Sequence, residues 1–172
     1  IFPFHGNLRR SFEINSMERS VPLALQPLLG FSLLFRYGVE LFPNELREFS
    51  PYFLGLFSVG LAYGALSFLG SKTARDRVFW LQQAVIFLVA IGLFSLQQKG
   101  WHGAFALLVF QALAIPFYLI VLTCHERRDS LPSASVTDYP VFALATAFAV
   151  LCALFLPVSI GFYGVLLVFW SL

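Results

Sequence analysis

The sequence predicts an all-α membrane protein, because its composition is too apolar for water and its long apolar runs match membrane spans. The 172 residues are 59% hydrophobic and only 12% charged, with a mean hydropathy of +0.80. A soluble globular chain has roughly 45–50% apolar and about 25% charged residues. So few charges cannot cover a water-facing surface, which argues against a soluble enzyme, a nucleic-acid binder and a disordered protein.

A helix needs about 20 mostly apolar residues to cross the hydrocarbon core. Five stretches meet or approach this length: residues 21–37, 50–70, 77–97, 101–124 and 139–170. None alternates polar and apolar residues as a membrane β-strand would, so helices are favoured. We therefore expect about five transmembrane helices in a single helical domain over residues 1–172, with a polar segment over residues 1–20. Polar loops are expected over residues 38–49, 71–76 and 125–138, and a tight turn around Lys99 and Gly100.

The last stretch is interrupted. As one straight helix, residues 139–170 would be about 48 Å long, which exceeds one ordinary span. Pro157 and Gly161 lie inside this stretch, and a proline removes a backbone hydrogen bond and clashes with the preceding turn. We expect one helix broken at Pro157, with two separate segments as the alternative.

The distribution of cations predicts the orientation. Five crossings place residues 1–20, 71–76 and 125–138 on one side of the membrane. Counting helix ends, that side holds eight of the 11 Lys and Arg residues. Cytoplasmic loops carry such an excess. The N-terminal segment is thus expected on the cytoplasmic or equivalent negative side of a bacterial or organellar inner membrane.

Titratable groups are missing from the middle of the predicted spans. No Asp, Glu or Lys lies near a midpoint, and glutamine cannot take up a proton near neutral pH. A candidate polar path consists of five residues: Gln82, Gln83, Gln111, His102 and Tyr163. Hydrogen bonds between helices are the competing use of the glutamines.

Small residues mark one face of the second span. Gly60, Gly64 and Ser67 share this face, and small residues at such spacing allow close helix packing. Packing inside the bundle is favoured over an interface with a partner chain.

The two cysteines, Cys124 and Cys152, lie in apolar runs and are expected to act as small hydrophobes. With nucleophile, phosphate-loop and metal motifs missing from the sequence, we expect no metal, no cofactor and no catalysis by this chain alone.

Several short motifs occur in a recognisable order. They lie at residues 2–6 (FPFHG), 41–44 (LFPN), 48–51 (EFSP), 63–66 (YGAL), 103–104 (GA), 125–128 (HERR), 156–157 (LP) and 161–164 (GFYG). In this order and spacing the chain resembles the antiporter-like membrane subunits of respiratory complex I (NADH:quinone oxidoreductase), of the chain M type. The resemblance covers almost the whole chain but only about the middle-to-late third of a family member. It implies an inverted-repeat fold with a discontinuous helix near the membrane midplane.

The family resemblance also implies a proton channel of buried Lys, His and Glu, and this chain departs from it at each such position. The family's Lys corresponds to Leu28 or Leu29, one His to a position near Val85, the other His to Gln111, and the Glu to Val165. These departures predict a membrane-arm subunit without a proton channel.

We therefore expect a structural or accessory subunit of a complex-I-like assembly, whose partners are other membrane-arm subunits and lipids, and not nucleic acid. Two alternatives remain. The chain is a transporter or channel that passes a neutral species along the glutamine path, or it is one half of a split proton-pumping subunit.

Overall fold

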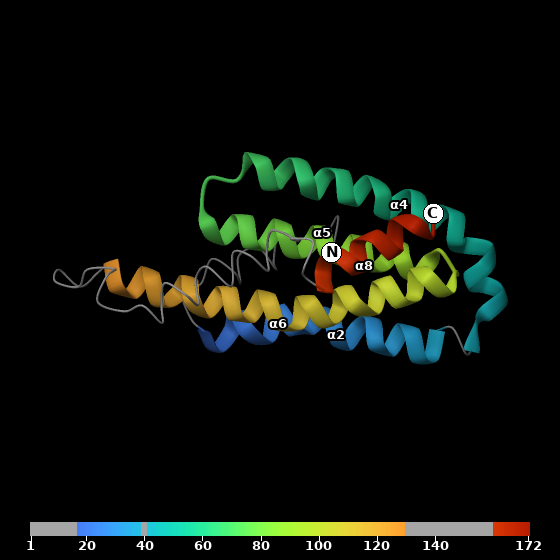
Figure 1. Cartoon of the computed structure of the whole chain (residues 1–172), viewed down its shortest axis with the longest axis horizontal. Helices are drawn as coiled ribbons and strands as arrows, with labels where there is room; N and C mark the ends of the chain where they lie inside the picture. Colours follow the sequence, from blue (N-terminus) through green and yellow to red (C-terminus); the bar gives the residue numbers. More distant parts are fainter. Residues whose placement is uncertain (1–16, 39–40, 130–159) are drawn as a thin grey trace.

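A computed structural model describes residues 17–38, 41–129 and 160–172, and this part of the chain consists of helices joined by short turns, without strands (Figure 1). The elements in chain order are α2 (Met17–Leu33), the π-helical turn η1 (Leu34–Gly38), α4 (Pro43–Gly70), α5 (Ala74–Phe94), α6 (Gln98–Asp129) and α8 (Ile160–Trp170). The predicted all-α membrane protein is confirmed. Within the described residues, three helices are long and apolar enough to cross a membrane: Pro43–Gly70, Ala74–Phe94 and Gln98–Ile120.

Two of the five predicted spans have no long apolar helix among these three. Residues 21–37 correspond to α2, which contains Pro22 and Pro27, followed by η1. Of residues 139–170, only α8 is described; the break predicted at Pro157 lies outside the described residues, whereas Gly161 is the second residue of α8. The number of spans and their boundaries stay predictions.

Helix α5 lies at the centre of the bundle. Helices α4 and α5 form an antiparallel hairpin, α6 runs back along α5, and α2 and α8 pack on α6 (Figure 1). In the most apolar window of α5, 78% of the residues are buried, against 11% in α4. Neighbouring helices therefore bury most of α5, whereas most of the surface of α4 is exposed.

Two helix boundaries differ from the sequence-based expectation. Residues 38–49 were expected as a polar loop, but α4 already begins at Pro43, with Pro in its first turn and Glu45 beside it. Proline at the first helical position has no N–H to lose, and an acidic residue there favours the helix dipole. Residues after Cys124 were also expected as a loop, whereas α6 continues to Asp129.

The turn between α5 and α6 lies earlier than predicted. We expected it around Lys99 and Gly100, but both lie in the first turn of α6. The chain reverses at Leu96, whose φ of 53° places a leucine in the left-handed region. The Ser95 hydroxyl donates a hydrogen bond to the Gly92 carbonyl at 2.8 Å. This bond satisfies one of the carbonyls that a helix end leaves unpaired.

Helices α6 and α8 cross at two glycines. A Cβ atom added at Gly103 would lie 2.7 Å from the Gly164 carbonyl oxygen, and one added at Gly164 would lie 3.0 Å from the Gly103 oxygen. Only residues without a side chain allow the two backbones to approach so closely. The crossing holds α8 against α6 and places Val168 in the core.

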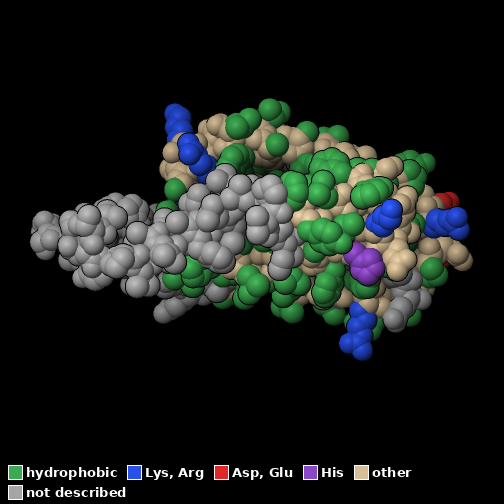
Figure 2. All heavy atoms as spheres, in the orientation of Figure 1, with side chains coloured by type: hydrophobic (Ala, Val, Ile, Leu, Met, Phe, Trp, Pro, Cys, Tyr) green, Lys and Arg blue, Asp and Glu red, His purple; other side chains and the backbone are tan. Residues whose placement is uncertain are grey.

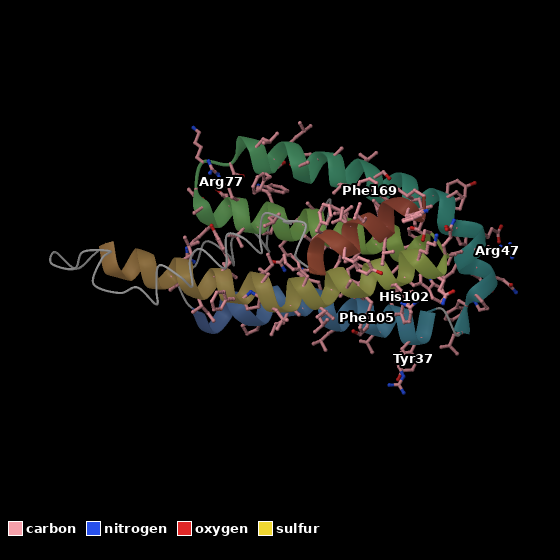
Figure 3. All side chains as sticks on the ribbon, viewed as in Figure 1. Tyr37, Arg47, Arg77, His102, Phe105 and Phe169 are labelled. Atoms are coloured by element: carbon pink, nitrogen blue, oxygen red, sulfur yellow. The ribbon has the colours of Figure 1, made fainter. Side chains whose placement is uncertain are left out.

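Charged side chains lie at the ends of the bundle and hydrophobic ones along its flank (Figure 2). Arg77 lies at one end, where α4 meets α5, and Arg47 lies at the other end (Figure 3). This arrangement fits a membrane protein whose polar ends face water and whose flank faces an apolar medium.

Candidate functional site

The candidate site is a cavity of about 510 Å³ between α2, α4 and α5. Its lining comprises Gln26, Pro27, Gly30, Phe31 and Leu34 of α2, Phe53 and Phe57 of α4, and Gln82, Gln83, Ile86, Phe87, Ala90 and Phe94 of α5. Such a volume is typical of small-molecule sites, which are mostly apolar with a few polar groups.

Four phenylalanines on α4 and α5 form one wall of the cavity, which we call the phenylalanine wall: Phe53, Phe57, Phe87 and Phe94. The ring centroids of Phe53 and Phe94 are 4.7 Å apart, and those of Phe57 and Phe94 are 5.5 Å apart. Aromatic rings at these distances attract one another beyond the burial of their surface. The wall therefore joins α4 to α5 and lines the cavity with aromatic rings.

Gln83 brings a polar group to this apolar site. Its side chain is 4% exposed, and its Oε1 has no hydrogen-bond partner within the described part of the chain. Gln83 is the tenth of 21 residues in α5, so it lies about 14 Å from the start of that helix at 1.5 Å per residue. The cavity thus reaches a polar group near the middle of the helix.

The structure brings together only part of the predicted polar path. Gln82 and Gln83 both line the cavity, whereas Gln111 is buried in α6 and is not among the lining residues. His102 is exposed near the start of α6 (Figure 3), and Tyr163 is 60% exposed on α8. Neither lines the cavity.

Three of the residues at which the family resemblance implies titratable groups, Val85, Leu28 and Val165, lie at one apolar core, whereas Leu29, the alternative to Leu28, is exposed. Val85 is 1% exposed and belongs to a cluster with Val89, Leu107 and Val168; Leu28 and Val165 pack against the same cluster. Gln111 is also buried, at 2% exposed. Three of the four positions therefore carry aliphatic side chains, and Val85, Val165 and Leu28 contribute to the interior of the bundle.

The small residues of α4 face α5. A Cβ atom added at Gly60 would lie 2.6 Å from the ring of Phe87, and one at Gly64 would lie 3.7 Å from the backbone nitrogen of Ala84. Ser67 is half-buried, and its carbonyl accepts a hydrogen bond from the Ser71 hydroxyl at 2.7 Å. Gly60 and Gly64 thus contact a helix of the same chain.

Sequence reasoning did not identify the phenylalanine wall or the buried Arg75. The 21 phenylalanines signalled dense aromatic packing, but their partners depend on how the helices pair. Arg75 is 8% exposed, and its Nη2 donates to the Thr123 hydroxyl at 3.4 Å, linking α5 to α6.

Among the described residues, no group of three His, Cys, Asp or Glu could hold a metal ion.

The chain is similar to known proteins over most of its length. It is 30% identical to NADH-quinone oxidoreductase subunit M of Rickettsia prowazekii, covering 95% of this chain and 35% of the relative. It is 31% identical to NAD(P)H-quinone oxidoreductase chain 4 3 of a Picosynechococcus species, covering all of this chain and 32% of the relative. It is 27% identical to the chloroplastic chain 4 of Ipomoea purpurea, covering 84% of this chain and 30% of the relative. The chain thus spans about a third of the length of these relatives, and no protein-family model matches it.

Proposed function

We propose that this chain, a homologue of the antiporter-like membrane subunits of complex I, is an accessory membrane-arm subunit without a proton channel of its own. A proton path through a membrane needs groups that gain and lose protons at depth. Such groups are the feature that distinguishes a pumping subunit from one that is retained for its shape and contacts.

The observation that carries the proposal is the apolar core around Val85. In the family resemblance, titratable groups stand near this position, at Leu28 or Leu29, and at Val165. Here Val85 belongs to one hydrophobic cluster and Leu28 and Val165 pack against it, whereas Leu29 is exposed and equally aliphatic. A charged side chain at the centre of a membrane helix costs about 2.5–3.5 kcal/mol on insertion scales. Because aliphatic side chains occupy these positions, they hold neither a charge nor a proton carrier.

The polar residues at mid-depth support the same conclusion. Gln83 and Gln111 lie near the middle of α5 and of the apolar part of α6, and both are buried. A carboxamide hydrogen-bonds as donor and acceptor but does not titrate near neutral pH. Both side chains are therefore suited to hold helices together or to bind a ligand, and not to relay protons.

The exposed flank of α4 supports a place in a larger assembly. Large apolar side chains are exposed on this flank of α4, and Leu56, Leu66 and Leu69 are each more than half exposed. Residues 51–70 carry no charge. Because the relatives are about three times longer than this chain, we propose that further membrane-arm helices, together with lipids, cover this flank.

The orientation is proposed from the cations. Lys72, Arg75 and Arg77 lie at the α4–α5 turn, and Arg47 and Lys99 lie at the opposite end. With the basic residues of 1–20 and 125–138, the α4–α5 turn is proposed on the cytoplasmic or negative side, as the positive-inside rule requires.

A flux measurement tests the loss of the channel. The chain is reconstituted in liposomes that contain a pH-sensitive dye, and a potassium gradient with valinomycin supplies the driving force. We expect no acidification above that of empty liposomes, and a protonophore added last verifies that the vesicles are sealed. Proton flux that depends on the protein would refute the proposal.

Extraction in a mild detergent tests the assembly. We expect mass spectrometry of the purified chain to identify other antiporter-like or quinone-reductase subunits in constant ratio. A chain that migrates alone after mild extraction would contradict an accessory role. A co-purifying chain that supplies buried Lys and His, with proton flux only when both are reconstituted, would instead assign the pair as a split pump.

A second candidate function is passage of a neutral species along Gln82 and Gln83, the part of the predicted polar path that lines the cavity. Its lining is mostly apolar, and Gln111 is not part of it, so the glutamines do not form one lined path in the described residues. Passage of water or glycerol would be measured as faster osmotic shrinkage or swelling of liposomes that contain the chain than of liposomes without protein.

A further inference from the structure

We propose that the cavity between α2, α4 and α5 binds a membrane-soluble phenol with apolar substituents, whose ring packs on the phenylalanine wall and whose hydroxyl donates a hydrogen bond to Gln83 Oε1. The described residues that line this site belong to α2, α4 and α5, so the proposal is tested on this chain by itself.

The depth of the site restricts the class of ligand. Gln83 lies in the middle of α5, the most sheltered of the apolar helices. A molecule that reaches this depth must first dissolve in the hydrocarbon region, where ions and strongly polar solutes are unfavourable. The cavity volume of about 510 Å³ falls within the range of small-molecule sites.

The apolar part of the lining favours an aromatic ring. Phe53, Phe57, Phe87 and Phe94 contact one another at centroid distances between 4.7 and 6.4 Å, and Phe31 of α2 lines the cavity with them. A further ring added to such a group gains offset-stacked or edge-to-face contacts. An acyl chain would fill the same space without these contacts.

The polar part of the lining presents an unpaired acceptor. Gln83 is 4% exposed, and its Oε1 has no partner within the described ranges of the chain. A carboxamide oxygen only accepts hydrogen bonds, and a buried acceptor without a donor is unfavourable. A phenol supplies the missing O–H together with the ring, whereas an acyl chain leaves Gln83 Oε1 unpaired.

The probe is 4-octylphenol, and its matched control is 4-octylanisole, which keeps the ring and chain but lacks the O–H. Binding isotherms are measured for the full chain in lipid nanodiscs and corrected for partition into empty nanodiscs. We expect the phenol to bind about tenfold more tightly than the anisole, which corresponds to about 1.4 kcal/mol. Equal affinities, or no binding of the phenol above partition, would overturn the proposal.

The Gln83→Met variant removes the acceptor at nearly constant volume. It is expected to bind 4-octylphenol as weakly as the unchanged protein binds the anisole, with anisole affinity unaltered. Gln111→Met is the matched control, because Gln111 is equally buried but does not line the cavity. A tenfold phenol preference that survives in Gln83→Met, or is lost in Gln111→Met, contradicts the assignment.

A second pair of variants tests the cavity itself without changing a polar group. Gly30 of α2 lines the cavity and Gly55 of α4 does not, and a Cβ atom at either position meets nothing within 4 Å. Gly30→Phe is expected to abolish binding of both probes, and Gly55→Phe to leave both unchanged. Binding that persists in Gly30→Phe would place the phenol elsewhere and refute the site.

Discussion

Replacing Gly103 with alanine should loosen the contact between α6 and α8. The added Cβ would lie 2.7 Å from the Gly164 carbonyl oxygen and 2.9 Å from both the Val168 nitrogen and Leu167 Cβ. Two of these three atoms belong to the backbone of α8, so no side-chain rotation relieves the overlap. The helices themselves must move apart.

The size of the effect follows from these distances. Carbon contacts are most favourable near 3.5–4.0 Å, so α8 must retreat by roughly 0.8 Å. Overpacking of a well-packed core costs about 1–3 kcal/mol, and alanine regains about 1 kcal/mol of helix propensity over glycine. We expect Gly103→Ala to lower the free energy of unfolding by up to about 2 kcal/mol.

Gly55→Ala is the control for helix propensity. Its Cβ meets nothing within 4 Å, so it should leave stability unchanged or raise it by at most about 1 kcal/mol. Reversible unfolding of both variants in mixed detergent micelles, followed by circular dichroism, measures the difference. Equal stability of Gly103→Ala and Gly55→Ala would show that α6 and α8 do not cross closely at Gly103.

Three further changes test local features. Thr73→Ala removes the acceptor for the Asp76 N–H at the start of α5 and should lower the free energy of unfolding by about 1 kcal/mol; Lys72→Ala, one residue earlier, should not, and thermal unfolding compares the two. Ser50→Ala removes the hydrogen bond that its hydroxyl donates to the Phe94 carbonyl, and a loss of about 1 kcal/mol is expected in denaturant titration; unchanged stability would show that this bond does not join α4 to α5. Leu96→Gly removes the cost of a leucine at a φ of 53°, about 1–2 kcal/mol, and loses the contacts of the leucine side chain, which offsets part of this gain. We expect a higher midpoint of thermal unfolding; a lower midpoint would contradict the left-handed turn.

The fold class and the three longest helices followed from the sequence because long apolar runs report membrane spans directly. Helix ends were harder. Residues Pro43, Asn44 and Glu45 are typical of a loop and equally of a helix start, and only the structure shows that they continue into α4. At the α5–α6 turn, no glycine, proline or asparagine marks Leu96, so the sequence placed the reversal at Gly100 instead.

The candidate site was predicted only in part, for a physical reason. Gln82 and Gln83 were identified as polar residues at depth, but a sequence pattern does not show that α2 packs on α6 while α4 packs on α5. The cavity lies between these three helices, α2, α4 and α5. The contact between Gly103 and Gly164 also joins residues distant along the chain, and neither periodicity nor composition pairs them.

The uncharged flank of α4 has a consequence for what can cover it. Acyl tails and leucine-rich helices offer nearly the same environment to an aliphatic side chain, since the hydrophobic effect does not drive helices together inside a bilayer. The exposed side chains of Leu56, Val59 and Leu66 therefore have nearly the same free energy whether lipid or an apolar helix covers them. Either covering, lipid or a neighbouring apolar helix, therefore suits this flank without a change in its residues.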